Sequence, residues 1–418
     1  MHYGVKVSLV ALFAAAMSAS SALSQDALSG NLRITAQMAD PAPRAVIESL
    51  VAGFSELHPD VDVELTIVDI EAWKTQIRNA LGANPPDVVT WFAANRMRPY
   101  VDAGLFEDIS DMYTNGDLTG LDAVKGAVTI DGKQWGVPYT YYPWGIYYRS
   151  DIFNELGLKE PATFDEEIAN CQKILDSGRS CYAIGTKFPW TAGGWFDYIN
   201  MRTNGFDFHM ALGRGEIPWT DDRVRATFAN WRKLIDMGAF VPDHQSYTFQ
   251  EGLTFFTEGK ATAYLLGNFI VGALRDAGMT DDQIDFYQFP TIGDFPKGED
   301  APTDTMHIPS GAANKENARA FLQYLTSADV QTKINAADGL GQFPVNADAS
   351  VGDDKFLQQG FDMLSNNAQG GLAQFFDRDF PAEMANAGLE GFQEFMVFPD
   401  NLDDILNRLE ETRARVYQ

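Results

Sequence analysis

The stretch AANKENARAFLQYLTSADVQTKINAADGLGQFPVN, at residues 312–346, has the clearest structural pattern in this sequence. Ala318, Phe321 and Leu325 share one face of a helix that follows an Asn-Lys-Glu start. A Ser-Ala-Asp cap begins a second helix, and a glycine-rich turn that ends in Pro344 follows it. The stretch therefore predicts a pair of helices with good caps.

Strands and helices alternate through the first hundred residues. Apolar residues at helical spacing predict helices at 44–57 and 73–81. Runs of alternating or apolar residues predict strands at 31–35, 61–68 and 87–91. Strands separated by helices favour a mostly parallel sheet, in which ligands collect at the carboxyl ends of the strands. These ends fall at residues 36–40, 70–73 and 91–96.

Residues 136–148, GVPYTYYPWGIYY, interrupt this pattern with aromatic residues, proline and glycine. A new alternation of helices and strands follows. We interpret 136–148 and 261–269 as crossings between two lobes, with a third return near 341–347. The sequence thus predicts an α/β fold class with two lobes. The expected division is residues 25–140 plus 270–346 for lobe 1, and 141–269 plus 347–418 for lobe 2.

The amino terminus predicts export. Lys6 precedes an apolar run at residues 7–17 that is too short to span a bilayer, and Ala22 and Ser24 are the small residues that a signal peptidase reads. We expect residues 1–24 to be a signal peptide and the mature chain to begin at Gln25. The remaining length of about 394 residues suggests two domains.

The composition limits the partners and cofactors. The formal net charge of −27 over 418 residues gives an acidic surface, which repels nucleic acid and anionic membranes. Five scattered histidines and two cysteines form no cluster of metal ligands, so neither a metal nor another cofactor is expected. Cys171 and Cys181 flank a helix end and a short strand, and in an oxidising compartment they predict a disulfide. Two unpaired core thiols are the alternative.

Five segments, in order, resemble the extracellular carbohydrate-binding proteins of ABC importers, family 1, which are related to maltose-binding protein. The segments are FSELHPDVDVEL, PPDVV with GLFEDIS downstream, VPYTYYPWGIYYRSDIF, FTEGKATAYLLGN and NKENARAFLQYLTS. The resemblance covers essentially the whole mature chain. It implies a two-lobe periplasmic-binding-protein fold, with hinge strands and an interlobe cleft.

The resemblance also implies a function. Proteins of this family capture a sugar in the periplasm, close on it like a Venus flytrap and present it to an ABC permease heterodimer in the inner membrane. We therefore expect an exported periplasmic monomer that binds a sugar or glycoside and is not an enzyme. The sequence contains no Walker motif, dinucleotide fingerprint or nucleophile elbow, which fits a carrier.

The candidate binding residues combine aromatic rings with hydrogen-bonding side chains. A sugar offers C–H faces that pack on flat rings and hydroxyl groups that need donors and acceptors. This mixture occurs at every predicted strand end, and several positions match ligand-contact positions of the resembled family. The candidates are Gln37, Glu71, Trp73, Trp91, Asn95, Arg96, Tyr142, Trp144, Trp190, Gly194, Trp195, Asn268, Phe269, Asp304, Thr305, Phe376, Asp377 and Arg378.

Some candidates have structural alternatives. Trp73 and Trp195 each begin a helix and could pack in a core. Arg96 could pair with a surface carboxylate, and Arg378 could pair with an acid of its own lobe. Asn95 stands where the resembled family carries an acid, which argues against assuming maltose as the ligand.

Two other functions stay open. A secreted glycosidase also needs aromatic platforms and paired carboxylates, and 58 acidic residues allow many such pairs. The same fold could instead bind a polyol or an anionic glycoside, since arginine side chains recognise anions well.

Overall fold

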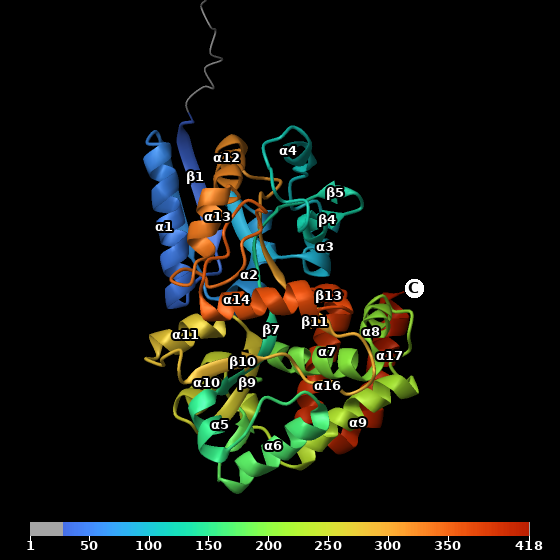
Figure 1. The fold of residues 1–418 in the computed structure, drawn as a ribbon. Coiled ribbons are helices and arrows are strands. Elements are labelled where there is room, and N and C mark those ends of the chain that lie inside the picture. Colours follow the sequence, from blue (N-terminus) through green and yellow to red (C-terminus); the bar gives the residue numbers. More distant parts are fainter. Residues whose placement is uncertain (1–27, 418) are drawn as a thin grey trace, which may run out of the picture.

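The computed structural model describes residues 28–417, so the predicted signal peptide and the expected start at Gln25 lie outside the described residues. The described chain forms two bodies, each with its own principal β-sheet, and Figure 1 shows one body above the other. Helices pack around both sheets. This is the two-lobe α/β arrangement that the sequence predicted.

The first sheet has the strand order β2-β1-β3-β12-β6. Its strands are β1 (Gly30–Ala36), β2 (Val61–Ile67), β3 (Val88–Phe92), β6 (Val137–Tyr141) and β12 (Thr303–His307). β1 runs parallel to β2 and β3, whereas β12 runs antiparallel to both β3 and β6. The carboxyl ends of β1, β2, β3 and β6 therefore meet at one edge, together with the amino end of β12.

Four helices pack against this sheet or continue from its strands: α1 (Pro41–Leu57), α2 (Ile70–Gly82), α12 (Lys315–Leu325) and α13 (Ala328–Asn335). α1 buries Val46, Leu50 and Phe54, which share one face at helical spacing. Asp69 caps α2, because its carboxylate accepts from the backbone N–H groups of Glu71 and Ala72. The buried face of α1 and the apolar residues of α12 form much of the core of the first body.

The helix pair at residues 312–346 is present, but its caps differ from the expected ones. Asn314 and Ser327 occupy the N-cap positions, and neither side chain bonds its own helix. Asn314 instead donates from Nδ2 to Asp87 Oδ2 at 3.0 Å, while Asp87 Oδ1 accepts the backbone N–H groups of Ala313 and Asn314. The buried Asp87 carboxylate thus anchors α12 to the start of β3.

The second sheet has the order β10-β7-β9-β8. Its strands are β7 (Trp144–Arg149), β8 (Ser180–Tyr182), β9 (Ala261–Gly267) and β10 (Ile284–Tyr287). β7 is antiparallel to both of its neighbours, and β8 is parallel to β9. The helices of this body include α5 (Ser150–Leu156), α6 (Phe164–Asp176), α7 (Trp190–Asn204), α9 (Asp222–Asp236), α10 (Phe249–Thr257), α11 (Ile270–Asp276), α16 (Ala382–Val397) and α17 (Leu402–Val416).

The expected division of the chain was wrong at one segment. We assigned residues 270–346 to the first lobe, but α11 and β10 belong to the second body. The Gly-Asn-Phe sequence after β9 begins α11 instead of crossing between the lobes, because Ile270 and Leu274 bury in the second core. The return to the first sheet comes later, at β12.

The remaining short elements complete both bodies. Near the first sheet lie η1 (Ala94–Arg96), α3 (Arg98–Asp102), α4 (Ser110–Thr114), η2 (Lys125–Val128), β4 (Thr129–Ile130) and β5 (Lys133–Gln134). The others are α8 (Phe206–Gly213), η3 (His244–Ser246), β11 (Gly298–Asp300), α14 (Lys355–Asp362), the π-helical turn η4 (Met363–Asn367), β13 (Gly371–Ala373), α15 (Phe376–Asp379) and η5 (Pro399–Asn401).

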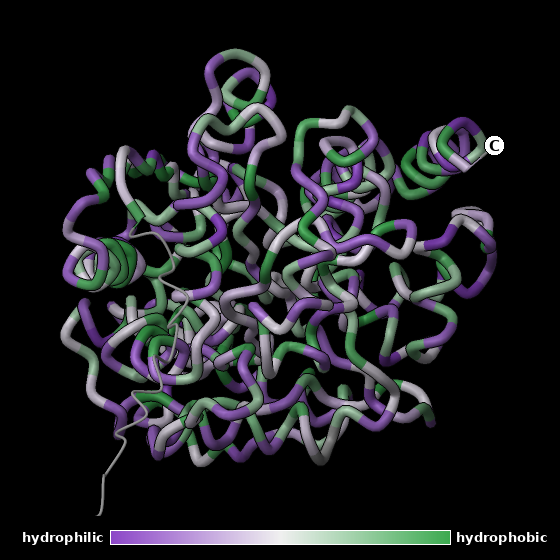
Figure 2. The backbone as a smooth tube through the Cα atoms, turned by 90° about the horizontal axis from the view of Figure 1, so that it is seen from above, coloured by the Kyte–Doolittle hydropathy of each residue, from purple (hydrophilic) through white to green (hydrophobic). Residues whose placement is uncertain are grey.

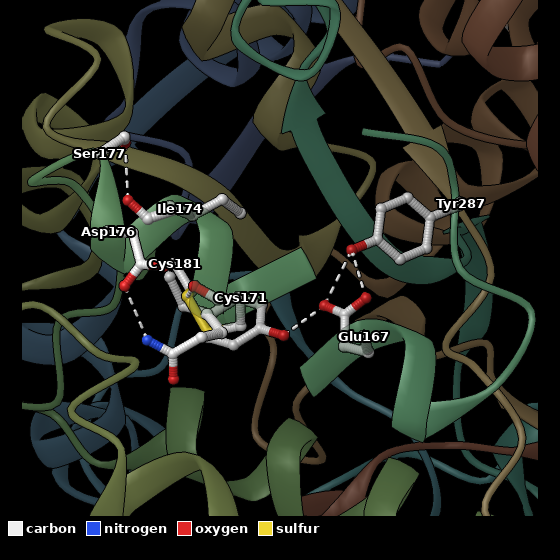
Figure 3. Close-up of a disulfide and its surroundings, with 9 residues drawn as sticks. Glu167, Cys171, Ile174, Asp176, Ser177, Cys181 and Tyr287 are labelled. Carbon is white, nitrogen blue, oxygen red and sulfur yellow. Dashed lines mark hydrogen bonds between the residues drawn. A yellow bond between two sulfur atoms is a disulfide. The ribbon is translucent and has the colours of Figure 1, made fainter. Parts of the chain in front are cut away.

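Cys171 and Cys181 form a disulfide with a Cα–Cα distance of 5.4 Å, which joins α6 to β8. Figure 3 shows the bridge beside the buried Glu167. The Glu167 carboxylate accepts hydrogen bonds from the hydroxyls of Tyr182 and Tyr287. The bridge and these bonds hold α6 against the second sheet.

The view from above places the C-terminus at the periphery of the molecule (Figure 2). Within residues 28–417, the helices are too short or too polar to cross a membrane.

Candidate functional site

A cavity of about 410 Å³ lies between the two bodies, and both contribute to its wall. This volume is within the range of about 300–1,000 Å³ that is usual for small-molecule sites. From the first body come Gln37 after β1, Ile70 after β2, Phe92 at the end of β3 and Asp304 in β12. The cavity therefore opens at the edge where the carboxyl ends of the strands meet, which is the usual ligand position in such sheets.

Eight of the predicted residues line this cavity. They come from both bodies and from the first crossing between them. They are Gln37, Tyr142, Trp144, Trp190, Phe269, Asp304, Asp377 and Arg378.

Aromatic rings form much of the wall. Trp144 and Phe375 stack with ring centroids 4.5 Å apart and an interplanar angle of 29°. Trp190 meets Trp144 edge to face at 6.0 Å, and Phe269 meets Tyr142 in the same way at 5.5 Å. Such pairs hold each ring in a fixed orientation, so flat faces are available without much ordering cost.

Gly194, in α7, makes room for this stack. A Cβ atom at residue 194 would lie 2.7 Å from Trp144 Cζ3 and 3.4 Å from the Phe375 ring. Gly194 does not line the cavity itself. It allows Trp144 to lie directly against α7.

Arg378 is the centre of a buried polar cluster. Its guanidinium donates to the Thr303 carbonyl at 2.7 Å and to the Tyr142 hydroxyl at 3.1 Å, and it lies 2.9 Å from Asp304 Oδ1. The guanidinium also lies over the Phe92 ring, 4.8 Å from its centroid. Because Thr303 and Asp304 belong to β12, Arg378 connects the two bodies beside the cavity.

The pKa of the Asp304 carboxyl responds to two opposing effects. Burial raises the pKa of Asp304, and the adjacent Arg378 guanidinium partly opposes this rise. Asp379 lies behind the wall, where burial raises its pKa to about 6 and the backbone N–H groups of Gln374 and Phe375 favour its charged form. These carboxylates are therefore held by specific donors and are poorly hydrated.

Lys74 supplies the other cation of the described wall. Its Nζ lies 2.9 Å from Glu71 Oε1 and within 6 Å of the ring centroids of Phe92 and Trp190. These two rings come from opposite bodies. Lys74 is thus a second link across the cavity, and Glu71 neutralises it from outside the wall.

Three buried polar atoms of wall residues lack a hydrogen-bond partner among the described residues: Gln37 Oε1, Trp144 Nε1 and Asp304 Oδ1, of which the last lies at ion-pair distance from Arg378. Gln37 Oε1 and Asp304 Oδ1 are acceptors, and Trp144 Nε1 is a donor. Buried polar atoms are normally paired, so these three are candidates for contact with a bound molecule.

Four predicted aromatic residues, Trp73, Trp91, Trp195 and Phe376, do not line the cavity, and their side chains are buried in the cores. Trp73 donates to the Thr90 carbonyl and Trp91 to the Arg96 carbonyl, and both pack within the first body. Trp195 and Phe376 are buried in the second core. Core packing, which was the alternative for Trp73 and Trp195, explains all four.

Five predicted polar residues lie near the wall without lining it. Glu71 holds Lys74, and Arg96 lies 3.7 Å from Asp377. Asn95 donates to the Asp379 carbonyl at 2.6 Å, and Asn268 donates to the Gly341 carbonyl at 2.8 Å. Thr305 is fully buried beside His307. In the structure all five support other residues instead of facing the cavity.

Three wall residues that the sequence did not single out are each adjacent to a predicted one. Phe92 follows Trp91, Lys74 follows Trp73, and Phe375 precedes Phe376. Trp91 and Phe92 lie on strand β3, where neighbouring side chains point to opposite faces. Trp73 and Lys74 lie on helix α2, where successive side chains point about 100° apart. At both places a shift of one residue exchanges wall and core. The clustering of aromatic residues in the sequence indicated the region of the site, but it did not show which side chains point into the cavity.

The fold and the site together define a two-lobe binding protein with a ligand cleft between its lobes. Residues 39–332 match the family model of bacterial extracellular solute-binding proteins. Since the match covers more than half of the chain, this chain belongs to that family.

Individual relatives share modest sequence identity. The multiple sugar-binding protein of Streptococcus mutans is 22% identical over 309 residues, which cover 71% of each chain. An uncharacterised ABC transporter extracellular-binding protein of Pyrococcus horikoshii is 24% identical over 286 residues. That alignment covers 67% of this chain and 63% of the relative, so it spans less than two thirds of the relative's length.

Solved structures match over nearly the whole chain. The bacterial solute receptor AcbH, described as having an exclusive preference for β-D-galactopyranose, aligns with a TM-score of 0.83 and 26% identity, over 93% of this chain and 100% of that one. The binding protein RafE in complex with raffinose aligns with a TM-score of 0.77 and 18% identity, over 93% and 100%.

Proposed function

We propose that this chain is the sugar receptor of an ABC importer and that the cavity between its lobes binds a sugar or small glycoside. The observation that carries this proposal is the composition of the cavity wall. The partly buried rings of Trp190 and Phe269 offer packing surfaces for a sugar ring, and the unpartnered Gln37 Oε1 and Trp144 Nε1 offer an acceptor and a donor for hydroxyls.

The names of relatives support a sugar as the ligand. The matches include a multiple sugar-binding protein, a maltotriose-binding protein and a receptor with preference for β-D-galactopyranose. One relative binds osmoprotective compounds, which keeps a polyol or glycoside of that kind in the test panel.

The remaining parts of the function follow from the same proposal. The chain acts as an exported, periplasmic monomer that closes around its ligand and delivers it unchanged to a permease heterodimer in the inner membrane. It has no catalytic role. The crossing between β6 and β7 supports closure, because Tyr142 and Trp144 lie at the junction of the two sheets and also line the cavity.

Binding is tested by two linked measurements. Mass spectrometry of the purified protein identifies any retained ligand, and calorimetry with that ligand and a panel of mono- and oligosaccharides should give saturable 1:1 binding. A Trp190→Ala variant should bind at least about tenfold more weakly, because it loses a packing face. Trp135→Ala is the matched control, since Trp135 is half-buried and lies outside the cavity wall.

Turnover separates this function from its main rival, a secreted glycosidase. After long incubation with each bound oligosaccharide, chromatography should recover it intact. Steady release of shorter sugars that is lost when cavity-lining residues are replaced would favour the glycosidase. Absence of any saturable sugar binding would refute the receptor function.

A further inference from the structure

The charged side chains of the cavity wall are mostly acidic. Among the described lining residues, the aspartates are Asp40, Asp69, Asp276, Asp304 and Asp377, and the cations are Lys74 and Arg378. The surrounding protein, with a net charge of −27, has the same sign. An anion that enters this cavity therefore meets more negative than positive charge.

Both cations of the wall already have partners. Arg378 donates to Thr303 and Tyr142 and forms an ion pair with Asp304 at 2.9 Å. Lys74 lies 2.9 Å from Glu71. A carboxylate, sulfate or phosphate on the ligand would have to displace Asp304 from Arg378 or Glu71 from Lys74. Otherwise the anion would be partly desolvated without a cation to pair with.

The unpartnered atoms favour hydroxyl groups. Gln37 Oε1 and Asp304 Oδ1 need donors, and Trp144 Nε1 needs an acceptor. A hydroxyl can serve each of these atoms because it both donates and accepts, whereas an ionised carboxylate can only accept. The two unpartnered acceptors and the one unpartnered donor thus match a neutral polyhydroxylated ring.

From this charge distribution we infer that the cavity selects neutral sugars and rejects the acid forms of the same rings. The inference rests on the proposed function and narrows its ligand class. It assigns Asp304 as a specificity-determining residue: by occupying Arg378, Asp304 removes the guanidinium that an anionic glycoside would use.

The test compares matched ligands by competition calorimetry at pH 7 and low ionic strength. D-Galactose, D-glucose and D-mannose are each measured beside the corresponding uronate and uronamide. The uronamide has nearly the size of the uronate and carries no charge, so it controls for the change at C6. For any ring that binds, the uronate should bind at least tenfold more weakly than the uronamide.

The variant Asp304→Asn sharpens the test. With Arg378 released, the ratio of uronate to uronamide affinity should rise at least tenfold relative to wild type. Asp400→Asn is the control, because Asp400 is an exposed aspartate that also pairs with an arginine, Arg232, and neither residue lines the cavity. It changes net charge by the same amount and should leave the ratio within twofold.

The outcomes separate this inference from the proposed function. If a uronate binds as tightly as its uronamide in the wild type, neutral selection is wrong and the sugar receptor stands. If Asp304→Asn folds, as judged by circular dichroism, and the ratio does not change, Asp304 does not determine specificity. If no neutral sugar or retained ligand binds at all, both proposals fail.

Discussion

Phe375 has a strained backbone at the cavity wall. Its φ of 113° and ψ of 147° lie in a region that L-residues rarely adopt. Neighbouring amides are held by buried carboxylates: Gln374 N–H donates to Asp379 and Phe376 N–H donates to Asp197, both at 2.7 Å. These bonds keep the Phe375 ring stacked on Trp144, so the surrounding core maintains the strain that the platform requires.

Replacing Phe375 should separate backbone strain from ring contact. Phe375→Ala and Phe375→Gly both remove the ring, so each should weaken sugar binding at least about tenfold in calorimetry. Because glycine tolerates positive φ, the glycine variant should be more stable than the alanine variant by about 1 kcal/mol in denaturant unfolding. Equal stability of the two variants would contradict the strain.

Gly194 is a second residue whose side chain, or lack of one, sets the cavity wall. Gly194→Ala would place Cβ 2.7 Å from Trp144 Cζ3, so the indole must shift. We expect weaker ligand binding and a loss of about 1–3 kcal/mol in unfolding free energy from overpacking. Gly82→Ala, which meets no atom within 4 Å, is the control: it should leave ligand binding unchanged and should not lower the unfolding free energy, because alanine favours a helix over glycine. Unchanged tryptophan fluorescence and ligand affinity in Gly194→Ala would show that Gly194 is not needed to position Trp144.

At the scale of elements, α6 carries a buried titratable group. Desolvation raises the pKa of Glu167 to about 7, although the hydroxyls of Tyr182 and Tyr287 favour its charged form. An unfolded glutamate has a pKa of about 4.3, so the folded state holds the proton more tightly. The stability contributed by this protonation is complete below about pH 4 and is lost as the pH rises through about 7.

Glu167→Gln should remove this pH dependence. Relative to wild type, the variant should gain up to about 3 kcal/mol of unfolding free energy as the pH rises from 5 to 8, measured by urea unfolding. Glu155→Gln, at an exposed glutamate paired with Arg179, controls for the loss of one charge. A difference between Glu167→Gln and wild type that stays constant with pH would show that Glu167 does not titrate in this range.

At the scale of the whole molecule, several contacts cross from one body to the other. Asn95 and Arg96 of the first body contact Asp379 and Asp377 of the second. Asn268 of the second body reaches the Gly341 carbonyl of the first. These contacts are polar, which suits lobes that separate and close again.

Ligand should therefore shift the protein toward a compact, more stable state. At a sugar concentration one hundred times Kd, the unfolding free energy should rise by about 2.7 kcal/mol. Small-angle scattering should show a decrease in the radius of gyration on binding. A non-binding sugar at the same concentration is the control, and identical scattering with and without bound ligand would contradict hinge closure.

The local patterns of the sequence determined the elements and much of the site composition. The spacing of Ala318, Phe321 and Leu325 gave α12, and the paired aromatic residues near 142–144 and 190 gave the cavity side chains. Such patterns are local: a helix repeats every 3.6 residues and a strand every two, and ligand contacts gather at strand ends.

Only the tertiary structure decided which members of each pair face the ligand and where the chain returns between lobes. Phe92 lines the wall while Trp91 fills the core, because neighbouring side chains of a strand point to opposite faces. Phe375 lines the wall while Phe376, the first residue of α15, fills the second core. β10 joins the second sheet by pairing with β7, which lies more than 130 residues earlier in the chain. Strand pairing and the Arg378–Asp304 contact depend on residues distant in sequence, so no local pattern could specify them.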